Sequence, residues 1–161
     1  MTGDYTREAG GAAIGARLRR LSAAFDGDVA RVYAALGIAF EQRWFGVLNQ
    51  IALRGPATVG ELAATLRITH VSVSQTRQSL AKAGLVVTQS DDDDARRKRL
   101  VLTPAGQALV DRLTPLWDLF ADAALALDAE AGGLAIALDR VDDALARRSL
   151  FDRIMDRART P

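Results

Sequence analysis

Apolar residues recur along the first third of the chain with the spacing of one helix face. Between Ile14 and Leu36 they stand three or four residues apart, which places their side chains on one side of an α-helix. A shorter pattern of the same kind covers residues 41–54, and the Gly-Pro pair that follows stops it. These patterns predict a long amphipathic helix and then a second, shorter one.

Two capping signals follow in the central third. Thr58 and Glu61 have the spacing of a capping box, in which the hydroxyl and the carboxylate each bond the other residue's backbone N–H. Thr69 has the position of a second N-cap, and Gly84 stands where a helix end favours glycine. The signals predict two short helices joined by a tight turn, the second helix running to Ala83.

Two runs of β-branched residues and leucines flank a block of charge. They are LVVTQ at residues 85–89 and RLVLT at residues 99–103, and four aspartates and a basic run stand between or next to them. This pattern predicts a two-stranded hairpin with a long charged tip. Thr103 is an N-cap before a proline, which predicts a long helix to about residue 127. After a Gly-Gly pair, a last apolar pattern predicts one helix over residues 134–157.

The second of the two short helices carries side chains suited to DNA. A pair of helices joined by about four residues is a helix-turn-helix, whose second helix enters the major groove. On a helical wheel, Val73, Thr76 and Leu80 point inward. The outer face and the start of this helix hold hydrogen-bonding groups and no acid: Thr69, His70, Ser72, Ser74, Gln75 and Gln78. We expect this set to contact DNA, with His70 either at a phosphate or simply solvated.

Composition removes several classes of function. The 161 residues suffice for one domain with a core, and they include no cysteine and one histidine. Thiol chemistry, cysteine-ligated zinc and histidine-rich metal sites are therefore excluded. The aspartate run lacks the glycine and glutamate of a calcium loop, and His70 has no orienting acid that would make it a base for Ser72 or Ser74. No catalytic residue, metal or cofactor is predicted.

Charge and hydropathy limit the kinds of partner that the protein can have. The formal net charge of +1 permits nucleic-acid binding without indicating it. The longest run without charge, residues 100–110, is much shorter than the roughly 20 apolar residues of a transmembrane helix. Residues 1–11 also lack the basic start and apolar stretch of a signal peptide. We expect a cytoplasmic protein without a membrane partner.

Three motifs stand in a fixed order between Thr58 and Gly106. They are TVGELAATLRIT, then VSVSQTRQSLAKAGLV, then DDDDARRKRLVLTPAG. The first resembles the second helix and turn of the winged helix-turn-helix in the MarR family of bacterial regulators. The second resembles that family's recognition helix, and the third its Asp-x-x-Asp-x-Arg wing followed by Leu-Thr-x-x-Gly. The long flanking helices stand where the family has dimerisation helices.

The resemblance implies a mainly α fold with a small β-wing, flanked by long N- and C-terminal dimerisation helices. Residues 1–40 would be the N-terminal dimerisation helix, residues 41–103 the winged helix-turn-helix DNA-binding domain, and residues 104–161 the C-terminal dimerisation helices. The protein would be a homodimer that binds a pseudo-palindromic operator in double-stranded DNA. Its two recognition helices would enter major grooves about 34 Å apart.

The resemblance also assigns roles in the wing. Arg96 matches the arginine that enters the minor groove, while Arg97 and Lys98 would contact phosphates. Asp91 and Asp94 match two acidic positions that hold the arginine and the turn by charge-assisted hydrogen bonds. In the recognition helix, Gln75 stands where the family commonly has arginine, and Arg77 where it more often has an apolar residue.

A small aromatic or anionic effector is the second partner that the resemblance implies. Candidate effector-binding residues are Tyr33, Phe40, Arg43, Trp44 and Phe45, although core packing explains such aromatic positions more readily. The resulting interpretation is a ligand-responsive transcriptional regulator, with repression favoured over activation. The alternative is a winged-helix protein-interaction module that has lost DNA binding, to which Gln75 and the acidic wing lend some weight. A small hydrolase or metal-dependent enzyme is a third, disfavoured reading.

Overall fold

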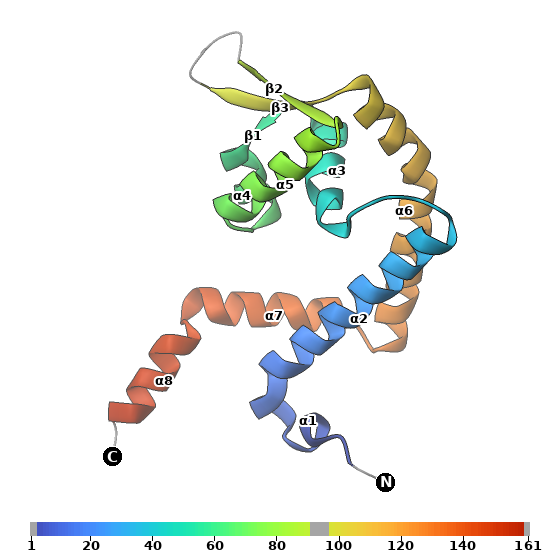
Figure 1. Cartoon of the computed structure of the whole chain (residues 1–161). Helices are drawn as coiled ribbons and strands as arrows, with labels where there is room; N and C mark the ends of the chain where they lie inside the picture. Colours follow the sequence, from blue (N-terminus) through green and yellow to red (C-terminus); the bar gives the residue numbers. More distant parts are fainter. Residues whose placement is uncertain (1–2, 91–96, 160–161) are drawn as a thin grey trace. The chain divides into compact units, whose positions relative to one another are not determined.

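The computed structural model of the chain describes residues 3–90 and 97–159 (Figure 1). The chain divides into two compact units, residues 1–110 and residues 111–161. Across the described ranges, none of the helices combines the length and the apolar character that crossing a bilayer requires.

The first unit begins with α1 (Tyr5–Glu8), the short 3-10 helix η1 (Gly10–Ala13) and the long helix α2 (Ile14–Ala35). The helix expected from residue 14 is confirmed, whereas α1 and η1 were not predicted. Asp4 caps α1 by accepting a hydrogen bond of 3.0 Å from the backbone N–H of Thr6, and it forms an ion pair of 3.0 Å with Arg20 of α2. The apolar stripe of α2 remains exposed at Ile14, Leu18, Leu21 and Phe25.

The winged module follows in the same unit. Its elements are η2 (Gln42–Trp44), α3 (Phe45–Arg54), β1 (Ala57–Thr58), α4 (Val59–Leu66), α5 (His70–Lys82), β2 (Val86–Ser90) and β3 (Lys98–Leu102). The three strands form an antiparallel sheet in the order β1-β3-β2. Both predicted strands are confirmed to within one residue at each end, and β1 was not predicted.

The core of the winged module draws on three helices and one strand. Its most completely buried side chains are Val47 and Leu48 from α3, Leu62 from α4, Val73 and Leu80 from α5, and Leu100 from β3. Helices α3, α4 and α5 pack against one another, and β3 packs against α3. This arrangement leaves the opposite side of α5 outside the core.

Helix α6 (Pro104–Glu130) starts where the sequence predicts and crosses from the first unit into the second. The threonine hydroxyl of Thr103 accepts a hydrogen bond of 3.0 Å from the backbone N–H of Gly106, which confirms the N-cap. The same hydroxyl donates to the carbonyl of Gly84 at 2.7 Å. The start of α6 is therefore fastened to the end of α5.

The expectation of one helix over residues 134–157 is wrong. The structure has two helices, α7 (Leu134–Arg147) and α8 (Leu150–Arg159), because Arg148 is extended, with φ −157° and ψ 121°. Ser149 then caps α8 by accepting a hydrogen bond of 3.1 Å from the N–H of Asp152. Arg153 holds the corner by donating to the carbonyls of Ala144 at 2.8 Å and Arg148 at 3.1 Å.

Candidate nucleic-acid interface

The turn before α5 is set by backbone geometry and by hydroxyl groups. Helix α4 ends at Leu66, and its C-cap Arg67 has a left-handed conformation, with φ +53°, that stops the helix. Thr69 then caps α5, and its Oγ1 accepts a hydrogen bond of 3.1 Å from the N–H of Ser72. The two hydroxyls also lie 2.8 Å apart and share a hydrogen bond. Two of the predicted DNA contacts, Thr69 and Ser72, therefore also define where α5 begins.

Helix α5 has one buried face and one exposed face, as the helical wheel predicts. Val73, Thr76 and Leu80 are buried. Of the predicted contact residues, His70, Ser72, Gln75 and Gln78 are exposed and Ser74 is half-buried. The polar side chains expected to meet DNA are thus brought together on the outer side of one helix.

Val71 was not among the predicted contact residues, yet its side chain is 65% exposed on α5. An apolar residue is easily assigned to the core, but Val71 lies two residues before the buried Val73 and four before the exposed Gln75. Helical spacing therefore places it with Gln75 rather than with Val73. A branched aliphatic side chain on this face can contact the methyl group of thymine.

The wing strands carry basic side chains beside the start of α4. Arg97 forms an ion pair with Glu61, with 2.8 Å between Nη2 and Oε1. Lys98 donates to Oγ of Ser90 at 2.7 Å, across the pair of strands. Arg99 donates to the carbonyl of Pro56 at 3.4 Å. Of the predicted wing residues, Asp91, Asp94 and Arg96 lie outside the described residues.

Glu61 bonds, through its carboxylate, both the backbone at the start of α4 and the wing residue Arg97. Its Oε2 accepts a hydrogen bond of 2.7 Å from the N–H of Thr58, while its own N–H donates to the Thr58 hydroxyl at 3.1 Å, which confirms the predicted capping box. The bond from the Thr58 backbone lowers the pKa of Glu61 most, and the charges of Arg97 and Arg99 lower it further. The carboxylate is therefore kept ionised at neutral pH.

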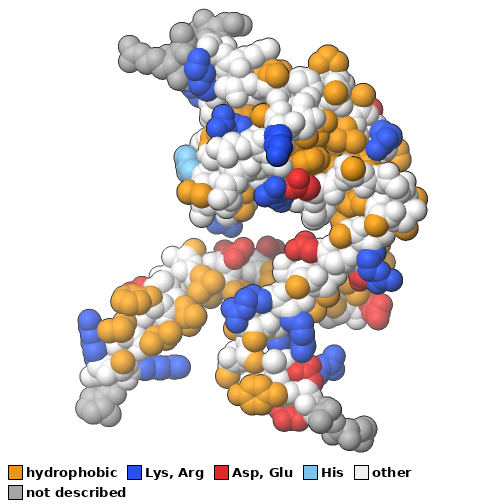
Figure 2. Space-filling model, in the orientation of Figure 1, with side chains coloured by type: hydrophobic (Ala, Val, Ile, Leu, Met, Phe, Trp, Pro, Cys, Tyr) orange, Lys and Arg blue, Asp and Glu red, His pale blue; other side chains and the backbone are white. Residues whose placement is uncertain are grey.

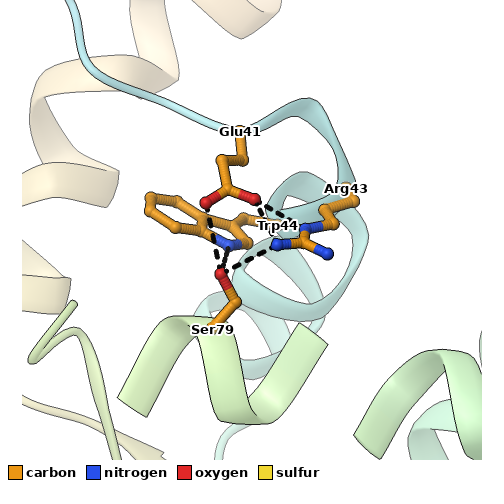
Figure 3. A network of polar contacts seen from close by, with 4 residues as sticks. All are labelled: Glu41, Arg43, Trp44 and Ser79. Carbon is orange, nitrogen blue, oxygen red and sulfur yellow. Dashed lines mark hydrogen bonds and ion pairs between the residues drawn. The ribbon is translucent and has the colours of Figure 1, made fainter. Parts of the chain in front are cut away.

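A second polar network joins α5 to the segment before α3 (Figure 3). Oγ of Ser79 accepts hydrogen bonds from Trp44 Nε1 at 2.9 Å and from Arg43 Nη2 at 3.2 Å. It donates to Oε1 of Glu41 at 3.2 Å, and Glu41 in turn pairs with Arg43 at 2.6 Å. No local pattern links Glu41 with Ser79, so the sequence does not predict this network.

An open groove of about 820 Å³ lies beside this network. Its lining residues are Glu41, Arg43, Trp44, Gln75, Gln78, Ser79, Lys82 and Ala83. Two candidate effector residues, Arg43 and Trp44, therefore share one groove with two candidate DNA contacts, Gln75 and Gln78.

The remaining effector candidates lie in an aromatic cluster. The ring of Phe40 is 4.9 Å from that of Tyr33 and 5.7 Å from that of Trp44, the latter in an edge-to-face arrangement. Tyr33 is only 2% exposed, and Phe45 is half-buried. Tyr33, Phe40 and Phe45 do not line the groove. No group of three acidic or histidine side chains suited to a metal occurs in the ranges that the structure describes.

The order of elements from α3 to β3 defines a winged helix-turn-helix. Residues 37–97 match the model of the MarR family, which confirms the resemblance seen in the sequence. The comparison with curated proteins finds no match.

Several solved structures share the fold, among them one described as a MarR family regulator. NMB1585 from Neisseria meningitidis is 24% identical with a TM-score of 0.62, over 83% of this chain and 92% of that one. BpsR from Bordetella bronchiseptica, whose DNA binding is regulated by 6-hydroxynicotinic acid, is 20% identical with a TM-score of 0.68, over 81% and 93%. MepR from S. aureus in complex with DNA is 19% identical with a TM-score of 0.68, over 81% and 97%. The chain thus has the mainly α, winged fold that the sequence predicts.

Proposed function

We propose that this protein is a homodimeric transcription regulator, and not an enzyme, that binds a pseudo-palindromic operator in double-stranded DNA in the bacterial cytoplasm. The observation that carries the proposal is the outer face of α5, where His70, Ser72, Gln75 and Gln78 are exposed together beside a basic wing. Hydrogen-bonding side chains on the second helix of a helix-turn-helix read base edges in the major groove. The DNA-bound structure of MepR, which has the same fold, supports this assignment.

The contacts divide into base reading and phosphate binding. Ser74, Gln75 and Gln78 would read bases, and a glutamine can pair bidentately with adenine. Thr69, His70 and Ser72 stand at the helix start, where they would meet phosphates or bases. In the wing, Arg96 would enter the minor groove while Arg97 and Lys98 bind phosphates, and Asp91 and Asp94 would stabilise the tip.

Dimerisation would cover the apolar faces that each unit leaves exposed. In α2 these include Leu18, Leu21 and Phe25; in α8 they include Leu150, Phe151 and Ile154. Apolar side chains are visible along α7 and α8 in Figure 2. Contiguous exposed apolar surface is typical of an interface between subunits, and a two-fold dimer would present two α5 helices to successive major grooves.

Ligand response would act through the groove beside α5. Arg43, Lys82 and the Trp44 indole offer cations and an aromatic ring, which suit a small aromatic or anionic effector, and 6-hydroxynicotinic acid in the BpsR system is such a molecule. Because Gln75 and Gln78 line the same groove, a molecule bound there would compete with DNA for α5. The extent to which it relieves repression would be set by how much more tightly it binds the DNA-free protein than the DNA-bound protein.

Binding to the gene's own upstream region tests the proposal. In a gel-shift titration at low salt, we expect a discrete complex at concentrations at which a scrambled fragment of equal length is free, with two chains per site by light scattering. A regulator that represses should also block transcription of that fragment in vitro. Absence of any complex, both with this region and with a random genomic library, would overturn the proposal in favour of the protein-interaction module.

A further inference from the structure

One carboxylate joins the start of α4 to the root of the wing. Glu61 uses Oε2 for the backbone N–H of Thr58, at 2.7 Å, and Oε1 for the guanidinium of Arg97, at 2.8 Å. The first bond is local and belongs to the capping box. The second connects residues 36 apart in the sequence, so it joins the wing to the helix-turn-helix.

Arg97 lies just beyond the point where the sheet has three strands. β1 pairs with β3 only at Leu100 and Arg99. Further out, β3 is paired with β2 alone, up to the Ser90–Lys98 pair. A two-stranded ribbon is marginally stable by itself. The bond between Arg97 and Glu61 therefore adds a tether where support from β1 ends.

We propose that Glu61 is a positioning residue for DNA binding, which holds Arg97 in place at the outer end of the β2–β3 pair. The inference rests on the proposed function. The side chain of Arg97 is 49% exposed, and a guanidinium has five N–H donors. Arg97 can therefore bond Glu61 and a phosphate together, so anchoring and DNA contact are compatible.

The sign of the effect separates this role from simple charge neutralisation. A carboxylate near DNA repels phosphate, so removal of its charge alone should tighten binding. A positioning role predicts that removal of the charge weakens binding, because an Arg97 side chain that is no longer held by Glu61 must be ordered again each time DNA binds. The hydrogen bond from Thr58 and the charge of Arg97 both lower the pKa of Glu61, which keeps the pair ionised under ordinary assay conditions.

Glu61→Gln is the sharpest variant, since the amide oxygen of glutamine can still accept from Thr58 in the capping box, while its NH2 group donates only and cannot accept from Arg97. Operator binding by the full chain is measured by fluorescence anisotropy for wild type, Glu61→Gln, Arg97→Ala and the double variant. We expect Glu61→Gln to bind about twofold to fivefold more weakly, the size of the coupling in an exposed ion pair. The double variant should bind no more weakly than Arg97→Ala.

Glu130→Gln in α6 removes an equivalent charge from an exposed glutamate outside the winged module and serves as the control. It should bind the operator as wild type does, or slightly more tightly. Binding by Glu61→Gln that equals or exceeds wild type would overturn the positioning role. Additive losses in the double variant would overturn it as well, because they would show that Glu61 and Arg97 act separately.

A second readout needs no DNA. The chain has no cysteine, so Gln89→Cys in β2 provides a unique site for a nitroxide label. We expect Glu61→Gln and Arg97→Ala to increase the label's mobility, while circular dichroism and urea unfolding show an intact fold. If neither substitution changes the mobility of the label, the bond between Glu61 and Arg97 does not hold the wing strands, whatever the operator affinity is, and the positioning role is overturned. If the substitutions increase the mobility of the label but the wild-type protein binds no DNA, the bond between Glu61 and Arg97 is supported and the proposed function is overturned. Failure of the positioning role and failure of the proposed function are therefore distinguishable.

Discussion

Trp44 donates a hydrogen bond of 2.9 Å from its indole Nε1 to Oγ of Ser79. Trp44 is the last residue of η2, before α3, and Ser79 lies in the last turn of α5. The same hydroxyl also contacts Glu41 and Arg43, each at 3.2 Å (Figure 3). The end of the helix proposed to read DNA is thus fixed to the segment that leads into α3.

Ser79→Ala should destabilise the fold because it removes the acceptor of a buried indole N–H. A buried donor without a partner costs about 1–3 kcal/mol, and we expect a loss near the lower end because Ser79 is half-buried. Urea-induced unfolding measures the difference. Ser22→Ala, at an exposed position of α2, is the control and should change the free energy of unfolding by less than about 0.5 kcal/mol. Equal effects of the two substitutions would contradict the role given to the hydroxyl.

The position of Gly106 explains why the Leu-Thr-x-x-Gly motif ends in a glycine. A Cβ at this position would lie 2.0 Å from the carbonyl oxygen of Leu85, and that oxygen already accepts a hydrogen bond of 3.0 Å from the N–H of Thr103. This bond holds the two backbone segments close together. The glycine is therefore required by close approach of two backbones, not by a turn conformation.

Gly106→Ala should lower the free energy of unfolding by about 1–3 kcal/mol, the usual cost of overpacking. Gly27→Ala in α2 makes the same chemical change where nothing lies within 4 Å of the added Cβ. There alanine should raise stability by up to about 1 kcal/mol through its higher helix propensity. Thermal and urea unfolding of both variants measure the two effects, and the same sign for both would refute the explanation.

Features set by neighbouring residues could be predicted from the sequence. The capping box of Thr58 and Glu61, the N-caps at Thr69 and Thr103 and the glycine after α5 each depend on a few adjacent positions. The division of α5 into a buried and an exposed face follows from helical spacing alone. These rules fixed the helix-turn-helix and its outer side chains.

Features that depend on distant partners could not be predicted. β1 has only two residues and exists because β3 pairs with it, so it has no pattern of its own. The hydrogen bonds that Arg97 donates to Glu61 and Ser79 donates to Glu41 join residues 36 and 38 apart in the sequence. The break at Arg148, by contrast, had a local signal: the apolar period lapses after Leu145, and Ser149 and Asp152 are spaced as a helix cap.

The carboxyl group of Asp4, which caps α1, should titrate far below the ordinary range of aspartate. The hydrogen bond from the Thr6 hydroxyl, at 2.6 Å, is the largest cause that lowers the pKa of Asp4 to about 2 from 3.8, and Arg20 lowers it further. A depressed pKa stabilises the fold above the unfolded value, and this contribution is lost as the pH falls from 3.8 through about 2. Carboxyl NMR should show a midpoint near 2, and Thr6→Ala should raise it. A wild-type midpoint near 3.8 would contradict the cap.

Base reading and phosphate binding can be separated by a matched pair of substitutions. Gln75→Ala removes an exposed amide from α5 and should weaken operator binding by about 1–3 kcal/mol while random DNA is bound almost as before. Lys98→Ala removes an exposed wing cation and should weaken both by similar factors, and the salt dependence of binding should fall by about one ion. Anisotropy titrations over a range of salt concentrations measure both quantities. If Gln75→Ala reduced the affinity for operator and random DNA equally, α5 would bind the DNA backbone instead of reading its bases.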